Sequence, residues 1–144
     1  MLYLLIGLVL VLAIGPVLWL LPSRQALGAS RLRLAARRYG LGVEMVQPAW
    51  PSWLSPLPPR QCAQYYLPRP GHQQQWCFWQ FAPGLWVDHL RDPCRDPQLA
   101  VALAKLPADA YQIEAKNQML LLCWGEQGDA ECLAVIKATL QSLP

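Results

Sequence analysis

The chain has 144 residues, of which 54% are hydrophobic, and its formal net charge is +3. Without its apolar N-terminal segment it is long enough for one domain with a modest core and too short for two. All 9 acidic residues follow residue 40, so the domain itself is slightly acidic and the excess positive charge lies before it. A nucleic-acid-binding domain needs a basic face, so we expect no nucleic acid among the partners.

Residues 1–22 form an apolar segment without a charged side chain. About 20 helical residues, rising about 1.5 Å each, cross a hydrocarbon core of about 30 Å, so this segment predicts one transmembrane helix. A cleaved secretory signal is the alternative, because residues 26–29 contain small side chains that resemble a cleavage site. Secretory signals begin with basic residues and have a shorter apolar stretch, so we expect an uncleaved anchor.

A basic segment, residues 23–40, follows the anchor and is predicted to be a helix, with Ser23 as its N-cap and Gly40 just past its end. Its basic residues are Arg24, Arg31, Arg33, Arg37 and Arg38. Basic residues beside a span stay in the cytoplasm, so we expect a single-pass protein with a cytoplasmic C-terminal domain. The arginines either bind anionic membrane lipid at the surface or serve only to set the topology, and both interpretations stay open.

The polar residues give no catalytic or metal motif. The cysteines are Cys62, Cys77, Cys94, Cys123 and Cys132, and their spacing fits neither paired zinc ligands nor a disulfide framework. An odd number of cysteines without such a framework is typical of a reducing compartment. His72 follows a turn signal and His89 ends a strand-like run, so neither is placed as a catalytic base. We therefore expect no enzyme, no cofactor and no metal.

Residues 47–59 are rich in proline and carry Trp50 and Trp53, which predicts an extended loop. Three roles are open for this loop: packing on its own domain, anchoring at the membrane interface, or binding a partner. Strands are predicted for residues 41–46, 61–67, 74–81 and 85–90, the last three as an antiparallel meander. Alternation along the third run places Trp76 and Trp79 on opposite faces of the sheet, so both faces need cover, and the loop is the nearest candidate.

The C-terminal part predicts two helices around a hairpin. Asp96 and Pro97 open the first helix and Pro107 ends it, while Asp129 caps the last helix. The hairpin is predicted for residues 111–115 and 118–124. Strands paired in hairpins with helices between them predict an α+β fold for residues 41–144, with an antiparallel sheet and helices on one face.

One part of the N-terminal region resembles a known group of proteins. The residues that carry the resemblance are Gly15-Pro16-Val17-Leu18-Trp19-Leu20-Leu21-Pro22-Ser23-Arg24-Gln25, Leu32-Arg33 and Ala36-Arg37-Arg38-Tyr39-Gly40-Leu41-Gly42-Val43. They look like small, uncharacterised single-pass inner-membrane proteins of Gram-negative bacteria. The resemblance implies a bacterial inner-membrane location and supplies no mechanism.

Two functions follow from this organisation. The first is a membrane-anchored, non-enzymatic accessory or adaptor protein that offers its loop or an aromatic sheet edge to another membrane protein. The expected contact residues are Trp50, Trp53, Trp76, Trp79 and Trp86. The alternative is a small-molecule binding module that closes Trp76, Trp79, Trp86 and Tyr65 around an apolar ligand. An enclosed aromatic pocket would favour the module, and a flat aromatic patch the adaptor.

Overall fold

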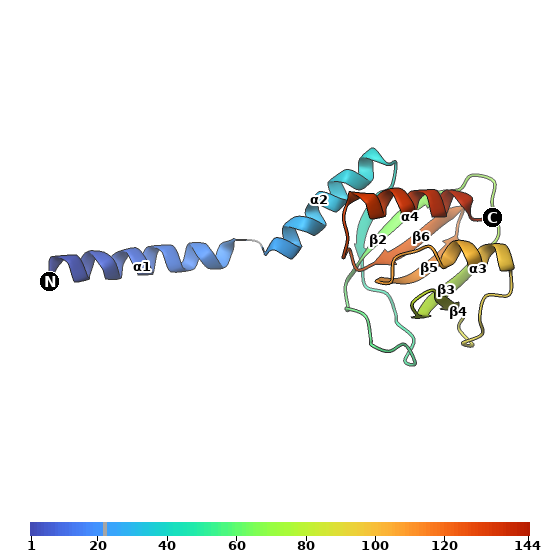
Figure 1. The fold of residues 1–144 in the computed structure, drawn as a ribbon, viewed down its shortest axis with the longest axis horizontal. Helices are drawn as coiled ribbons and strands as arrows, with labels where there is room; N and C mark the ends of the chain where they lie inside the picture. Colours follow the sequence, from blue (N-terminus) through green and yellow to red (C-terminus); the bar gives the residue numbers. More distant parts are fainter. Residues whose placement is uncertain (22) are drawn as a thin grey trace.

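The computed structural model describes residues 1–21 and 23–144, so Pro22, the last residue of the predicted anchor segment, lies outside it (Figure 1). The described helices are α1 (Leu2–Leu20), α2 (Arg24–Arg38), α3 (Pro97–Leu103) and α4 (Ala130–Ser142). The strands are β1 (Gly42–Val46), β2 (Cys62–Pro68), β3 (Trp76–Ala82), β4 (Leu85–Val87), β5 (Ala110–Lys116) and β6 (Met119–Trp124). An apolar helix followed by a small domain with an antiparallel sheet and helices confirms the predicted α+β class.

Helix α1 is apolar on every side. It has 19 residues, and none of them is buried against the domain. The mean hydropathy over 18 consecutive residues of the helix is 2.5. By length and composition it can cross a membrane, a property that a signal sequence shares. A helix that is apolar on every side is typical of a membrane span or of the inside of a large core, and α1 is not buried in the core of this domain.

Helix α2 has the predicted caps. The Oγ of Ser23 accepts a hydrogen bond from the backbone N–H of Ala26 at 3.1 Å, and Gly40 has a φ of 75° just past the helix end. Leu32 and Ala36 are buried in the core of the domain. Helix α2 therefore belongs to that core, and the division drawn from the sequence at residue 41 does not follow a packing boundary.

The six strands form one antiparallel sheet in the order β1-β2-β6-β5-β3-β4. The predicted meander of β2, β3 and β4 is therefore wrong, because the β5–β6 hairpin lies between β2 and β3. Strand β6 carries fully buried side chains on both faces, Leu122 on one and Cys123 on the other, and such a strand favours the centre of a sheet, where both faces are covered. The β3–β4 hairpin is confirmed, although β4 ends at Val87 instead of residue 90.

One face of the sheet, here called the helix face, holds the main core. Tyr65, Leu122, Ile113 and Phe78 lie side by side across four strands on this face. Helices α3 and α4 lie in front of it in Figure 1, and Leu103, Leu133 and Ile136 join the same core. Helices on one face were predicted, and this arrangement confirms it.

The opposite face, here called the loop face, is covered by residues 47–59, which we call the Pro/Trp loop. Trp53 packs edge-on against Trp79, with ring centroids 6.0 Å apart, and also lies against Phe81. Trp50 packs edge-on against Tyr111 at 5.8 Å. Leu54 from the same loop is buried. The loop therefore packs on its own domain, as the first of its three possible roles required.

Candidate functional site

The five tryptophans expected to form a contact surface are divided between the two faces. Trp86 is buried in the helix-face core and Trp76 packs against that core, whereas Trp79 lies on the loop face under Trp53. Tyr65 is fully buried against Trp124. A single pocket lined by Trp76, Trp79, Trp86 and Tyr65 therefore cannot form, because the sheet separates its members.

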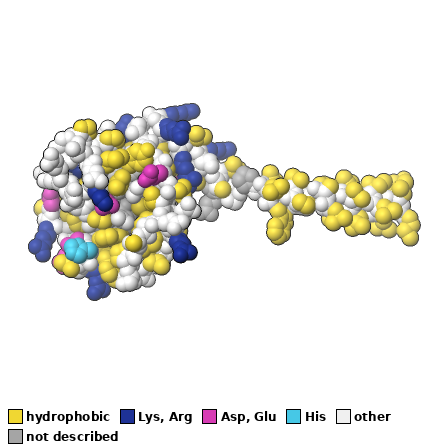
Figure 2. All heavy atoms as spheres, turned by 180° about the vertical axis from the view of Figure 1, so that it is seen from behind, with side chains coloured by type: hydrophobic (Ala, Val, Ile, Leu, Met, Phe, Trp, Pro, Cys, Tyr) yellow, Lys and Arg dark blue, Asp and Glu magenta, His cyan; other side chains and the backbone are white. Residues whose placement is uncertain are grey.

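The loop face carries an apolar surface that the tryptophans do not dominate. Leu57, Phe81 and Leu85 are 66%, 47% and 40% exposed. Phe81 lines a groove of about 230 Å³, which we call the proline groove; its lining also includes Leu54, Pro56, Pro58, Pro83 and Tyr111. Figure 2 shows this side of the molecule, with hydrophobic side chains gathered across the middle of the domain. An exposed apolar surface of this kind is typical of a contact site.

Gln80 fixes one wall of the proline groove. Its Nε2 donates hydrogen bonds to the carbonyl oxygens of Pro107 and Ala110 at 3.1 and 2.6 Å, and its Oε1 accepts from the N–H of Gly84 at 2.9 Å. These bonds tie the β3–β4 turn to the start of β5. Leu57, Phe81 and Pro83 were not identified from the sequence as candidate site residues. Leu57 could have been identified, because it is an apolar residue between two prolines and such a segment cannot join a sheet.

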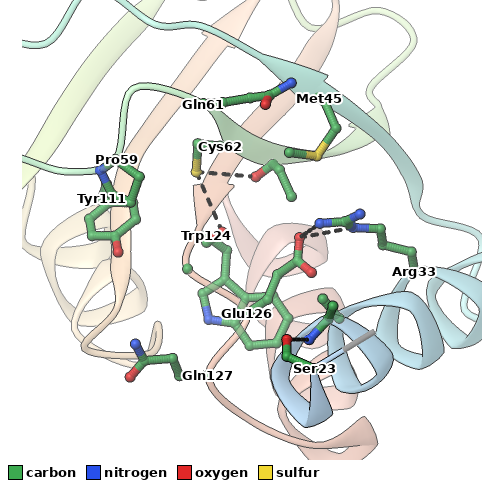
Figure 3. Close-up of a pocket in the computed structure, with 14 residues that line it drawn as sticks. Ser23, Arg33, Met45, Pro59, Gln61, Cys62, Tyr111, Trp124, Glu126 and Gln127 are labelled. Carbon is green, nitrogen blue, oxygen red and sulfur yellow. Dashed lines mark hydrogen bonds and ion pairs between the residues drawn. The ribbon is translucent and has the colours of Figure 1, made fainter. Parts of the chain in front are cut away.

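A second hollow, of about 340 Å³, lies at the end of the sheet beside the first turns of α2 (Figure 3). Arg33 crosses it from α2, and its Nε and Nη2 donate to the Oε1 of Glu126 at 3.1 and 3.0 Å. The Glu126 side chain is only 5% exposed, against 37% for Arg33. Arg33 therefore pairs with a carboxylate inside the domain and ties α2 to the end of β6, while its expected role at the membrane surface stays a prediction.

The carboxyl group of Glu126 is buried, and burial disfavours its charged form. Burial raises the pKa of its carboxyl group, and the hydrogen bonds and charge of Arg33 partly oppose that rise. Burial and the nearby charge of Glu126 also raise the pKa of the Tyr65 hydroxyl. Neighbouring Asp109 accepts from the Nε1 of Trp124 at 2.8 Å and from the N–H of Gln127 at 2.7 Å, which fixes the loop that presents Glu126. Arg33, Asp109 and the Oε1 of Glu126 thus bind within the protein and hold the fold. The Oε2 of Glu126 and the hydroxyl of Tyr65 are buried without a hydrogen-bond partner among the described residues.

The other arginines of the basic segment remain on the outside of α2. Arg24, Arg31, Arg37 and Arg38 are exposed. Within residues 1–21 and 23–144, the ion pairs join Arg33 to Glu126 and Arg95 to Asp92, so these four guanidinium groups have no carboxylate within 4.0 Å. Their charges are therefore available to an external anion.

Comparison with protein-family models, with curated proteins and with solved structures finds no match to this chain. Its function is therefore inferred from its own residues.

Proposed function

We propose that the chain is a membrane-anchored, non-enzymatic adaptor whose domain binds another membrane protein through the proline groove. The observation that carries this proposal is the exposure of Phe81 in a groove lined by prolines, together with the exposure of Leu57, which lies in the chain between two of those prolines. The Pro/Trp loop contains no charged residue, so a partner can cover it without removing a charge from water. The rigid sheet behind the loop fixes the groove before binding, which lowers the entropic cost of association.

The proposed location is the bacterial inner membrane, with α1 as an uncleaved span and the domain in the cytoplasm. The apolar length of α1 and the arginines that follow it support this orientation. Five unpaired cysteines in the described domain are compatible with a reducing compartment.

The orientation leads to a prediction with two opposite outcomes. A reporter that is active only in the cytoplasm, fused after Pro144 in a Gram-negative host, is expected to work, because moving the basic segment across the membrane is unfavourable. A reporter that is active only in the periplasm is expected to fail at the same position. The reverse pattern would place the domain outside the cytoplasm.

The groove can be tested by one exposed side chain and its matched control. Leu57 and Leu90 are 66% and 67% exposed, so Leu57→Ser and Leu90→Ser each remove the same apolar group from water at little cost in stability. Leu57→Ser is expected to weaken capture of a membrane partner by about tenfold, measured by quantitative co-purification from gently solubilised membranes. Leu90→Ser should leave it unchanged. Equal capture by both variants would contradict the groove as the binding site.

A second candidate function, binding of a small molecule, rests on another hollow. This hollow has a volume of about 320 Å³ and lies at the edge of the helix face, beside Trp76, Phe78 and Leu99. The rings of Trp76 and Phe78 are 5.6 Å apart. The volume is near the lower limit for a small-molecule site. Saturable quenching of tryptophan fluorescence by an aromatic ligand, abolished by Trp76→Leu and unaffected by Leu57→Ser, would favour this function over the adaptor.

A further inference from the structure

The outward face of α2 carries leucines and arginines in one stripe. Arg24, Leu27, Arg31, Leu34 and Arg38 follow one another at intervals of three and four residues, which places them on one side of a helix. We call this set the outer stripe. Leu32 and Ala36 point the other way, into the core. Leu27 and Leu34 are 44% and 65% exposed, and each lies between two arginines of the stripe.

The outer stripe is cationic and has no internal counter-charge. Helix α2 contains no acidic residue. Among the described residues, its exposed arginines form no ion pair, in contrast to Arg33 on the inner side. The headgroup region of a membrane has anionic phosphates at its surface and apolar acyl chains beneath them. It can therefore bind both the unpaired arginines and the exposed leucines of the stripe. A protein partner would need a regular row of carboxylates around apolar pockets to match the same stripe.

Chain length keeps the stripe near the end of α1. Helix α1 ends at Leu20 and α2 begins at Arg24, and four residues of chain reach at most about 14 Å. Because α2 has 15 residues, it extends only about 22 Å from that point. If α1 spans a bilayer, the first turn of α2 lies at the surface of that bilayer, whatever the angle between the two helices.

We propose that the outer stripe binds the surface of anionic phospholipid, with Leu27 and Leu34 between the headgroups and the arginines on their phosphates. This inference rests on the proposed anchoring by α1. It gives the domain a fixed orientation, since α2 is joined to the sheet through the core and through the Arg33–Glu126 pair. Helix α2 contacts β1, whereas the proline groove lies near β3 and β4 at the other edge of the sheet, so the groove stays open to a partner.

The test uses the full chain in vesicles of phosphatidylcholine alone or mixed with phosphatidylglycerol. A photoreactive benzophenone side chain replaces Leu34 in the stripe, or Val135, which is 48% exposed on α4, as the control. Lipid adducts are expected at position 34 and not at position 135, and only in vesicles with phosphatidylglycerol. Arg31→Gln with Arg38→Gln should lower the adduct at position 34 by well over tenfold, because each basic residue near an anionic surface changes association by about fivefold. High salt should act in the same direction.

A third position separates this inference from the anchoring on which it rests. The same probe in place of Leu10, in the middle of α1, should form lipid adducts in both kinds of vesicle. Adducts at position 10 without adducts at position 34 would overturn the lipid contact of the stripe and leave the anchor standing. Adducts at neither position would overturn both. Adducts of position 34 to protein in native membranes would also overturn the inference and assign the stripe to a protein partner.

Discussion

Replacing Trp50 and Trp53 together with alanine is expected to lower the free energy of unfolding of the domain by about 4 kcal/mol. Both rings are half-buried, so about 2 kcal/mol each is appropriate, below the 3 to 5 kcal/mol typical of a fully buried tryptophan. Trp53 loses its contacts with Trp79 and Phe81, and Trp50 loses Tyr111 and the hydrogen bond from its Nε1 to Pro59 O at 2.9 Å. The measurement is urea unfolding of the full chain in mild detergent, followed by far-ultraviolet circular dichroism.

The chain supplies its own control for this experiment. Trp19 in α1 is 92% exposed, so Trp19→Ala should not change the stability of the domain. Phenylalanine at both loop positions should recover most of the lost stability, because the edge-on aromatic contacts can persist. Unchanged stability in the double alanine variant, together with lost capture of a partner, would show that the loop acts as a binding element and not as part of the scaffold.

The local elements were predictable because their signals are local. Asp96 and Asp129 cap α3 and α4 as expected, with side-chain oxygens that accept from the N–H groups of Gln98 and Glu131. The β5–β6 hairpin turns at Asn117, whose φ of 52° suits a tight turn. Each of these features depends on residues within a few positions of one another.

The order of the strands was not predictable in the same way. Alternation of apolar residues tells which face a side chain occupies, and it does not tell which strand lies beside it. Residues 68–71 contain two prolines and a glycine, a turn signal from which one expects β2 to lead directly into β3. Instead, the N–H of Arg69 donates to Gln118 O, which continues the pairing of β2 with β6.

The candidate sites were predictable only where their residues lie close together in the sequence. Alternation along β3 already placed Trp76 and Trp79 on opposite faces, so a pocket that contained both was inconsistent with the strand itself. The Arg33–Glu126 pair joins residues 93 positions apart, and no local pattern marks it. In the sequence Arg33 is one of several similar arginines; only the fold distinguishes it from the exposed ones.

Removing the charge of Arg33 is expected to destabilise the domain by about 2 kcal/mol at pH 7, because the carboxylate of Glu126 is then buried without a cation. The value is below that of a fully buried pair since Arg33 is 37% exposed. Burial already raises the pKa of Glu126, and Arg33 opposes that rise, so Arg33→Gln should raise the pKa further. A carboxyl group whose pKa is higher in the folded state stabilises the fold fully below its unfolded pKa of about 4.3. That contribution is lost as the pH rises through the folded pKa.

The loss in Arg33→Gln should therefore be largest at neutral pH and shrink as the pH falls toward about 4. Adding Glu126→Gln to the same chain should recover most of the stability at neutral pH and remove this pH dependence, because no buried charge remains. Arg95→Gln is the surface control: its pair with Asp92 is 4.0 Å long, with side chains 90% and 49% exposed, and should contribute almost nothing. A loss in Arg33→Gln that does not vary with pH would assign the role of Arg33 to packing. If charge is the cause, the pair that joins α2 to the end of β6 also holds the basic helix in a fixed relation to the sheet that carries the proline groove.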